Sequence, residues 1–173
     1  TILGGMVTSA NRFFDNNNLQ FLNNNAYTGG IDFRQYFSDK KYYISTHFIG
    51  SHIQGSTEAI TNQQESSRRY FQKPDAEYMS LDSSRTTLSG YGGNFLFTKQ
   101  VNKGLSFMAN VTWRSPGLEL NDMGYMRRAN SIFQYIWVGY RITEPFSIFR
   151  SMNINGNQWA GFDFGGTNTF KGG

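Results

Sequence analysis

The sequence predicts an all-β protein: an antiparallel up-and-down transmembrane β-barrel, or an arc of a larger one, with about seven strands visible. Three observations predict it. Several segments alternate apolar and polar residues with a period of two, and the connections between them alternate between short and long. The 173 residues also include 16 Phe, 10 Tyr, 3 Trp and 19 Gly, a composition typical of pleated surfaces and tight turns. No apolar run approaches the ~18 residues that a transmembrane helix needs.

Segment 105–114 shows the alternation most clearly. Its odd-numbered residues are apolar from Leu105 to Trp113, and its even-numbered residues are mostly polar, over about the length that a tilted strand needs to cross a bilayer. Segment 26–37 behaves alike and places Asp32 and Arg34 together on its polar face, where we expect them to pair. The other expected strands are 2–13, 41–54, 86–99, 131–142 and 146–159.

The connections separate into two classes. Three are short, at 38–40, 100–103 and 143–145, and three are long, at 14–25, 55–85 and 115–130. Short turns alternating with long external loops are typical of outer-membrane barrels. Because seven strands leave an open edge, which lipid does not tolerate, we expect residues 1–173 to form one barrel segment that pairs with remaining strands beyond it. The expected location is the bacterial outer membrane, with its lipid as a partner.

The polar sides of these strands predict a lumen. The predicted lumen-facing residues are Asp32, Arg34, Asn110, Thr112, Asn153 and Asn155. Trp113, Trp137 and Trp159 are predicted to belong to aromatic belts at the bilayer edges.

Composition excludes several other classes. There is no Cys, so neither a disulfide framework nor a thiolate site is expected. The two histidines, His47 and His52, stand five apart on one expected strand and therefore on opposite faces, so we expect no metal and no cofactor. The net charge of +4 is spread along the chain without a basic helix, which argues against nucleic acid as a partner.

The long loop 55–85 carries a candidate ligand-binding cluster. Cations, aromatic rings and an amide follow one another there and are suited to sugars or phosphate groups: Arg68, Arg69, Tyr70, Phe71 and Gln72. The alternative is a loop that folds into the barrel mouth, with Arg69 paired to Asp75 inside it.

The loop 115–130 carries the candidates for catalysis. Glu119 and Asp122, joined across the mouth by Asp75, can serve as a carboxylate pair of a hydrolase if their side chains lie ~5–9 Å apart. The alternative is that Glu119 and Asp122 cap turns and pair with Arg114, Arg127 or Arg128. Because neither a nucleophile nor a metal set accompanies these acids, the sequence favours a protein that is not an enzyme.

Two loop strings carry a family resemblance. Residues 69–76 read RYFQKPDA and residues 114–125 read RSPGLELNDMGY. Together with segments 149–151 and 157–159 they resemble an uncharacterised family of Bacteroidota outer-membrane proteins. Its members pair an N-terminal, family-9-like carbohydrate-binding domain with a large C-terminal β-barrel. The resemblance implies a middle segment of that barrel, and it supplies no established catalytic residues to carry over.

Three functions remain open at this point. The first is an outer-membrane barrel that handles or binds an external glycan, another polymer or a partner protein through its lumen and long loops. The second is a membrane-associated hydrolase with acidic residues at the barrel mouth. The third is a soluble all-β carbohydrate-binding module.

Overall fold

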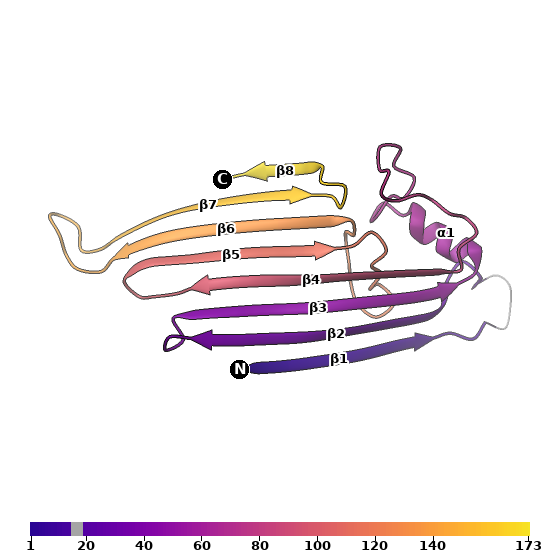
Figure 1. Cartoon of the computed structure of the whole chain (residues 1–173), viewed down its shortest axis with the longest axis horizontal. Coiled ribbons are helices and arrows are strands. Elements are labelled where there is room, and N and C mark those ends of the chain that lie inside the picture. The colour runs from indigo at the N-terminus through magenta and orange to yellow at the C-terminus, as the bar shows by residue number, and fades with distance from the viewer. Residues whose placement is uncertain (15–18) are drawn as a thin grey trace.

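The computed structural model describes residues 1–14 and 19–173 and shows one eight-stranded antiparallel sheet (Figure 1). Each strand pairs with the next along the chain, in the order β1 to β8. The strands are β1 (Ile2–Asn11), β2 (Asn23–Phe37), β3 (Tyr42–Gly55), β4 (Thr87–Lys99), β5 (Gly104–Arg114), β6 (Ser131–Ile142), β7 (Met152–Phe162) and β8 (Asn168–Gly172).

The predicted all-β antiparallel meander is confirmed, and its closure into a barrel stays a prediction. Strands β1 and β8 are the two edges of an open sheet (Figure 1). The sequence reading missed β8. It also began the seventh strand too early: residues 146–149 form a tight turn in which Phe146 N donates to Phe149 O at 2.9 Å, and β7 begins at Met152.

One face of the sheet, here the apolar face, carries the large hydrophobic side chains. The strand registers place Phe33, Thr46, Phe95 and Val111 in one row across β2 to β5. Because side chains alternate between faces, the same face also carries Ile31, Phe48, Ile136, Val138 and Ile154, all of them exposed. Tyr42, Phe97 and Phe107 pack their rings against one another on it, and Phe48 packs against Trp113.

The opposite face, here the polar face, carries the remaining strand side chains. All six predicted lumen residues lie on it: Asp32, Arg34, Asn110, Thr112, Asn153 and Asn155. Arg34 Nε donates to Ser45 Oγ at 3.3 Å, and its guanidinium lies 5.7 Å from the Tyr43 ring centre. The expected pairing of Asp32 with Arg34 is not found within residues 1–14 and 19–173, because Arg34 leans toward β3 instead.

The three long connections gather at one end of the sheet, the loop end, together with the short β7–β8 connection, and the β2–β3, β4–β5 and β6–β7 connections lie at the other, the turn end (Figure 1). At the loop end, residues 12–22, 56–86 and 115–130 join the strands; residues 15–18 of the predicted loop 14–25 lie outside the described part. The loop 56–86 folds back onto the polar face, where Ile60 and Phe71 bury Ala26, Ile53 and Leu88. The apolar core therefore lies under the loops and does not extend along the sheet.

A short helix that the sequence reading missed, α1 (Thr57–Glu65), begins this loop. Ser56 caps it, accepting a hydrogen bond from Ala59 N at 3.0 Å. Gln64 is fully buried, donates to Asp82 O at 2.8 Å and accepts from Asp82 N at 3.0 Å, so one amide fixes the far end of the loop to the helix.

Within the described ranges, no helix combines the length and the apolar character needed to span a membrane.

Candidate functional site

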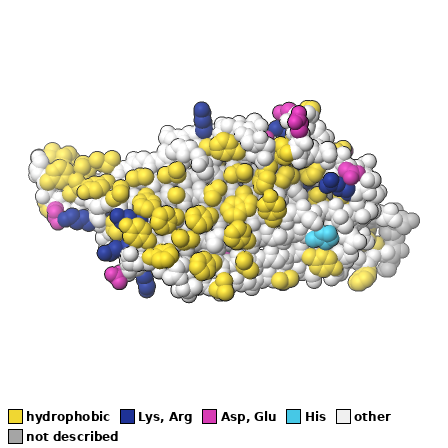
Figure 2. All heavy atoms as spheres, viewed as in Figure 1, with side chains coloured by type: hydrophobic (Ala, Val, Ile, Leu, Met, Phe, Trp, Pro, Cys, Tyr) yellow, Lys and Arg dark blue, Asp and Glu magenta, His cyan; other side chains and the backbone are white. Residues whose placement is uncertain are grey.

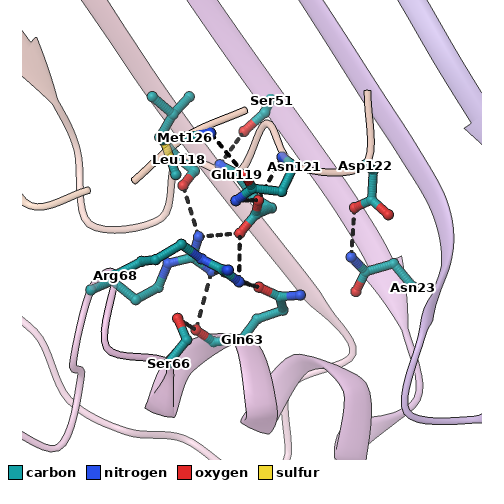
Figure 3. A network of polar contacts seen from close by, with 11 residues as sticks. Asn23, Ser51, Gln63, Ser66, Arg68, Leu118, Glu119, Asn121, Asp122 and Met126 are labelled. Carbon is teal, nitrogen blue, oxygen red and sulfur yellow. Dashed lines mark hydrogen bonds and ion pairs between the residues drawn. The ribbon is translucent and has the colours of Figure 1, made fainter. Parts of the chain in front are cut away.

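The two longest loops meet over the polar face in a buried charged junction. It consists of Arg68, Arg69 and Gln63 from loop 56–86 and of Glu119 and Asn121 from loop 115–130. Figure 3 shows Arg68 and Gln63 reaching from the α1 side toward Glu119 and Asn121. Both loops contact the sheet directly, through Ile60 of α1 and through Glu119 N, and the junction connects them over the polar face.

Arg69 is the centre of the loop junction. Its side chain is entirely buried and forms an ion pair with Glu119 Oε2. The same guanidinium donates to Leu118 O at 3.0 Å, to Gln63 O at 3.1 Å and to Gln63 Oε1 at 3.3 Å. Burial lowers the pKa of Arg69, and the neighbouring Glu119 carboxylate opposes that change. A buried charge held by four acceptors is a structural element, not a free ligand contact.

Glu119 is equally enclosed and is satisfied on both oxygens. Oε1 accepts from Asn121 N at 2.7 Å and from Asn121 Nδ2 at 2.6 Å, while Arg68 adds a second cation 3.8 Å from Oε2. Burial by itself raises the pKa of Glu119, but the Arg69 charge and the hydrogen bonds from Asn121 and Arg69 outweigh it, so the pKa lies below its ordinary value. Glu119 is therefore an anion, and it is not suited to act as a general acid.

The backbone of loop 115–130 lies directly on the sheet. Glu119 N donates to Ser51 Oγ of β3 at 2.9 Å, and Tyr91 N of β4 donates to Ser115 Oγ at 2.8 Å. At Gly90 a Cβ would overlap the backbone of Leu118, so only glycine lets the loop approach this closely. The sheet face and the loop therefore form one packed unit.

Two further carboxylates fasten the loops at their margins. Asp122 accepts from Arg12 Nη1 and from Asn23 Nδ2, both at 2.7 Å, which connects loop 115–130 to the β1–β2 connection. Asp163, which follows β7, accepts from Lys73 Nζ at 3.2 Å. Burial raises the pKa of Asp163, but the hydrogen bonds from Thr167 and Lys73 outweigh it and lower the pKa overall.

The five residues of the predicted ligand-binding cluster separate in the structure. Arg69 and Phe71 point inward, the first into the junction and the second into the core under α1. Arg68 is part-buried and bonded to Gln63 Oε1 at 3.1 Å. Only Tyr70 and Gln72 are exposed, Tyr70 at a positive φ of 56° and Gln72 donating to Glu65 O at 3.1 Å. The five side chains therefore do not form one surface.

The predicted catalytic carboxylates also have separate partners. Glu119 binds Arg69, Asp122 binds Arg12, and exposed Asp75 lies 3.5 Å from Lys73. The expected partners Arg114, Arg127 and Arg128 for Glu119 and Asp122 were wrong, and so was Asp75 for Arg69, because the inward fold of loop 56–86 brings Arg69 to Glu119 first. Across the described residues, no three metal-ligating side chains come together.

Sequence reasoning missed the residues that complete the junction. Gln63 and Asn121 supply amides to the charged pair, and Arg12, Asn23 and Lys73 hold the outer carboxylates. Gln63 lies in α1 and Asn121 in loop 115–130, each close in the chain to one partner, but only the buried pair gives them a role. The carboxylate partners of Arg12, Asn23 and Lys73 at these margins lie 90 or more positions away, so no local pattern signals them.

The fold and the junction define a class: an all-β meander with segregated faces and two loops fastened onto the polar one. The chain belongs to a family described as a domain of unknown function, DUF5916, whose model matches residues 46–167. That range begins within β3 and runs past β7, so it covers both interlocked loops. No curated protein and no solved structure matches the chain.

Proposed function

We propose that this chain is part of the wall of an outer-membrane β-barrel. Its apolar face contacts lipid, its polar face lines the lumen, and its two long loops narrow the lumen at one end. Such a protein handles or binds an external glycan or another polymer. The observation that carries the proposal is the separation of charge and apolar surface between the two faces of one sheet.

The charged residues of the strands divide unevenly. On the apolar face they are Lys99, the last residue of β4, and Lys171, on the edge strand β8. On the polar face they are Asp32, Arg34, Arg114 and Arg141, from the inner strands. Figure 2 shows the apolar face, with hydrophobic side chains over its middle and charged ones toward its ends and margins. A charge near the bilayer midplane costs about 2–4 kcal/mol, which is the physical reason for such a division.

The two edges of the sheet support the same proposal. Strands β1 and β8 each pair on one side only, so their outer backbone N–H and C=O groups have no strand partner among residues 1–14 and 19–173. β1 also exposes Leu3, Met6 and Val7. In lipid each unpaired backbone group costs several kcal/mol. We propose that further strands pair with both edges.

The loop arrangement is consistent with a narrowed lumen. Loops 56–86 and 115–130 cover the polar face only at the loop end, and the buried junction holds them there. The polar face toward the turn end stays open. A solute that enters would therefore meet fixed loops first and the polar wall next.

The absence of cysteine allows a direct test by single labels. Val138→Cys on the apolar face and Asn155→Cys on the polar face are spin-labelled in the protein reconstituted into liposomes. We expect lipid-soluble oxygen to relax the label at 138 and a water-soluble nickel chelate to relax the label at 155. Equal access of the nickel chelate to both positions would show that the apolar face does not lie in a bilayer and would overturn the proposal.

A further inference from the structure

The polar face carries a second feature, remote from the loop junction. A pocket of about 430 Å³ lies at the turn end, over β4 to β7. Its lining includes Tyr135, Trp137, Arg141, Met108 and Asn153. Trp137 was predicted to belong to an aromatic belt, but the registers place it on the polar face with Tyr135, opposite Asn157 and Trp159 of β7. The prediction that Trp137 and Trp159 form lipid-facing belts is therefore not supported by the register.

Trp137 lies along the wall of this pocket. A Cβ at Gly139 would stand 2.5 Å from Cζ2 and 2.6 Å from Cη2 of the indole, so the ring occupies the space above that glycine. Trp159 occupies the space above Gly172 in the same manner, with Cζ2 2.6 Å from a Cβ placed there. A ring that lies along a sheet presents its broad surface to the space above it, and a flat apolar surface of this kind stacks on the C–H face of a sugar ring.

Polar groups without partners surround this ring. Arg141 lies opposite Asn153, Gly139 opposite Asn155 and Trp137 opposite Asn157. None of these four polar side chains has a hydrogen bond or an ion pair in the part of the chain that the structure describes, and all four are exposed. Three amides at every second position form a row of donors and acceptors spaced ~7 Å apart.

The charge of the pocket favours an anion. Arg141 carries the positive charge of the lining on the polar face, and no carboxylate lines the pocket; Lys99 belongs to the rim, but its ammonium lies over the Tyr42 ring on the apolar face. Glu144, on the adjacent turn, is engaged by Lys103. A guanidinium without a partner beside a free indole and amides fits a carboxylate attached to a sugar ring, since Arg binds a carboxylate through two parallel hydrogen bonds.

We propose that this pocket binds a uronic-acid unit of an acidic oligosaccharide. The sugar ring stacks on Trp137, its carboxylate binds Arg141, and its hydroxyl groups bond to Asn153 and Asn155. Trp159, diagonally across on β7, provides a platform for a second unit. The assignment rests on the proposed function, because it takes the polar face as the lumen wall, and it adds the class of ligand.

The test measures the binding of hexagalacturonate to the whole protein in detergent by tryptophan fluorescence and calorimetry. We expect saturable binding, with maltohexaose, a neutral sugar, at least about tenfold weaker. Arg141→Gln and Trp137→Ala should each weaken binding of hexagalacturonate about tenfold or more. Tyr140→Ala, on the same strand but on the apolar face, is the matched control and should leave the affinity unchanged. Heat-modifiable migration on gels verifies that each variant is folded.

Three results would overturn the inference: no binding of hexagalacturonate, equal binding of oligoglutamate, or an affinity that the folded Arg141→Gln variant leaves unchanged. Equal binding of oligoglutamate would indicate an acidic peptide as the ligand. The two proposals fail separately. If the spin label at 138 lies in lipid and hexagalacturonate does not bind, only the uronic-acid site is rejected. If the label at 138 lies in water and hexagalacturonate binds specifically, the pocket stands and the barrel wall is rejected.

Discussion

Arg69 and Glu119 lie fifty positions apart in the chain and form an ion pair in which the two side chains are 0% and 1% exposed. Each comes from a different long loop. The pair therefore joins the two loops, together with the hydrogen bond from Ala129 N to Arg68 O at 2.9 Å. A buried pair of this kind contributes little net stability compared with apolar residues, but removing one partner leaves an unpaired charge in the interior.

Glu119→Gln tests the cost of removing one partner of the buried ion pair. We expect a loss of about 3–5 kcal/mol in the stability of the packed loops, because Arg69 keeps its charge without a carboxylate. Protease cleavage within 56–86 under native conditions measures the opening of the loops. The double variant Arg69→Met with Glu119→Leu should recover most of the loss. A single variant as protected as the wild type would contradict the role given to the pair.

Acid should loosen the loops for a related reason. The pKa of Glu119 in the folded protein lies below its ordinary value of 4.5, so the carboxylate stabilises the fold fully above that pH. The contribution is lost as the pH falls through the lowered folded pKa. Asp163, whose pKa is also lowered from 3.8, should act in the same direction. Hydrogen exchange of loop amides against pH measures the effect, and Glu119→Gln should reduce the acid-dependent part.

Gly90→Ala probes the contact of loop 115–130 with the sheet. A Cβ there would overlap the Leu118 backbone, which cannot move without lifting the loop from β4. We expect a loss of about 1–3 kcal/mol, measured by denaturant unfolding with a probe on loop 115–130. Gly156→Ala in β7 is the control, since nothing lies within 4 Å of a Cβ placed there. Similar losses in both variants would point to a backbone propensity effect instead of overlap.

Val138→Arg tests how much a cation on the apolar face changes the free energy of folding into liposomes. A cation on the lipid-facing side of a barrel costs about 2–4 kcal/mol near the midplane, so folding into liposomes should weaken by that amount. Asn155→Arg, on the polar face of the neighbouring strand, should change the free energy of folding by less than about 0.5 kcal/mol. Guanidinium titrations in liposomes measure both. Equal effects would indicate that the two faces share one environment.

Much of the sheet was predictable because its cause is local. Alternation at 105–114 and 26–37 assigns each side chain to a face, and the registers then keep the six predicted lumen residues on one face. The short strand β8 was missed because 168–172 has no sustained alternation. Helix α1 was missed because it is short and its mean hydropathy is low; its buried residues are only Ala59, Ile60 and Gln64.

The loop junction was not predictable from local patterns. The sequence pointed to Arg69 and Glu119 as chemically notable, but it assigned Arg69 to Asp75 and Glu119 to arginines near it in the chain. Ion pairs and hydrogen bonds form between groups that the fold brings together, and sequence proximity says little about that distance. The loop folded back along the polar face and brought Arg69 to Glu119, leaving Asp75 outside with Lys73.

By itself the sequence determined the strand meander, the two unlike faces and the end at which the long loops gather, because a period of two and turn length act between neighbouring residues. Only the tertiary structure decided which charges are buried, that the loops pack onto the polar face, and that Trp137 and Trp159 lie there with free amides. Those outcomes depend on long-range packing, in which a single glycine such as Gly90 permits a contact that no local pattern encodes.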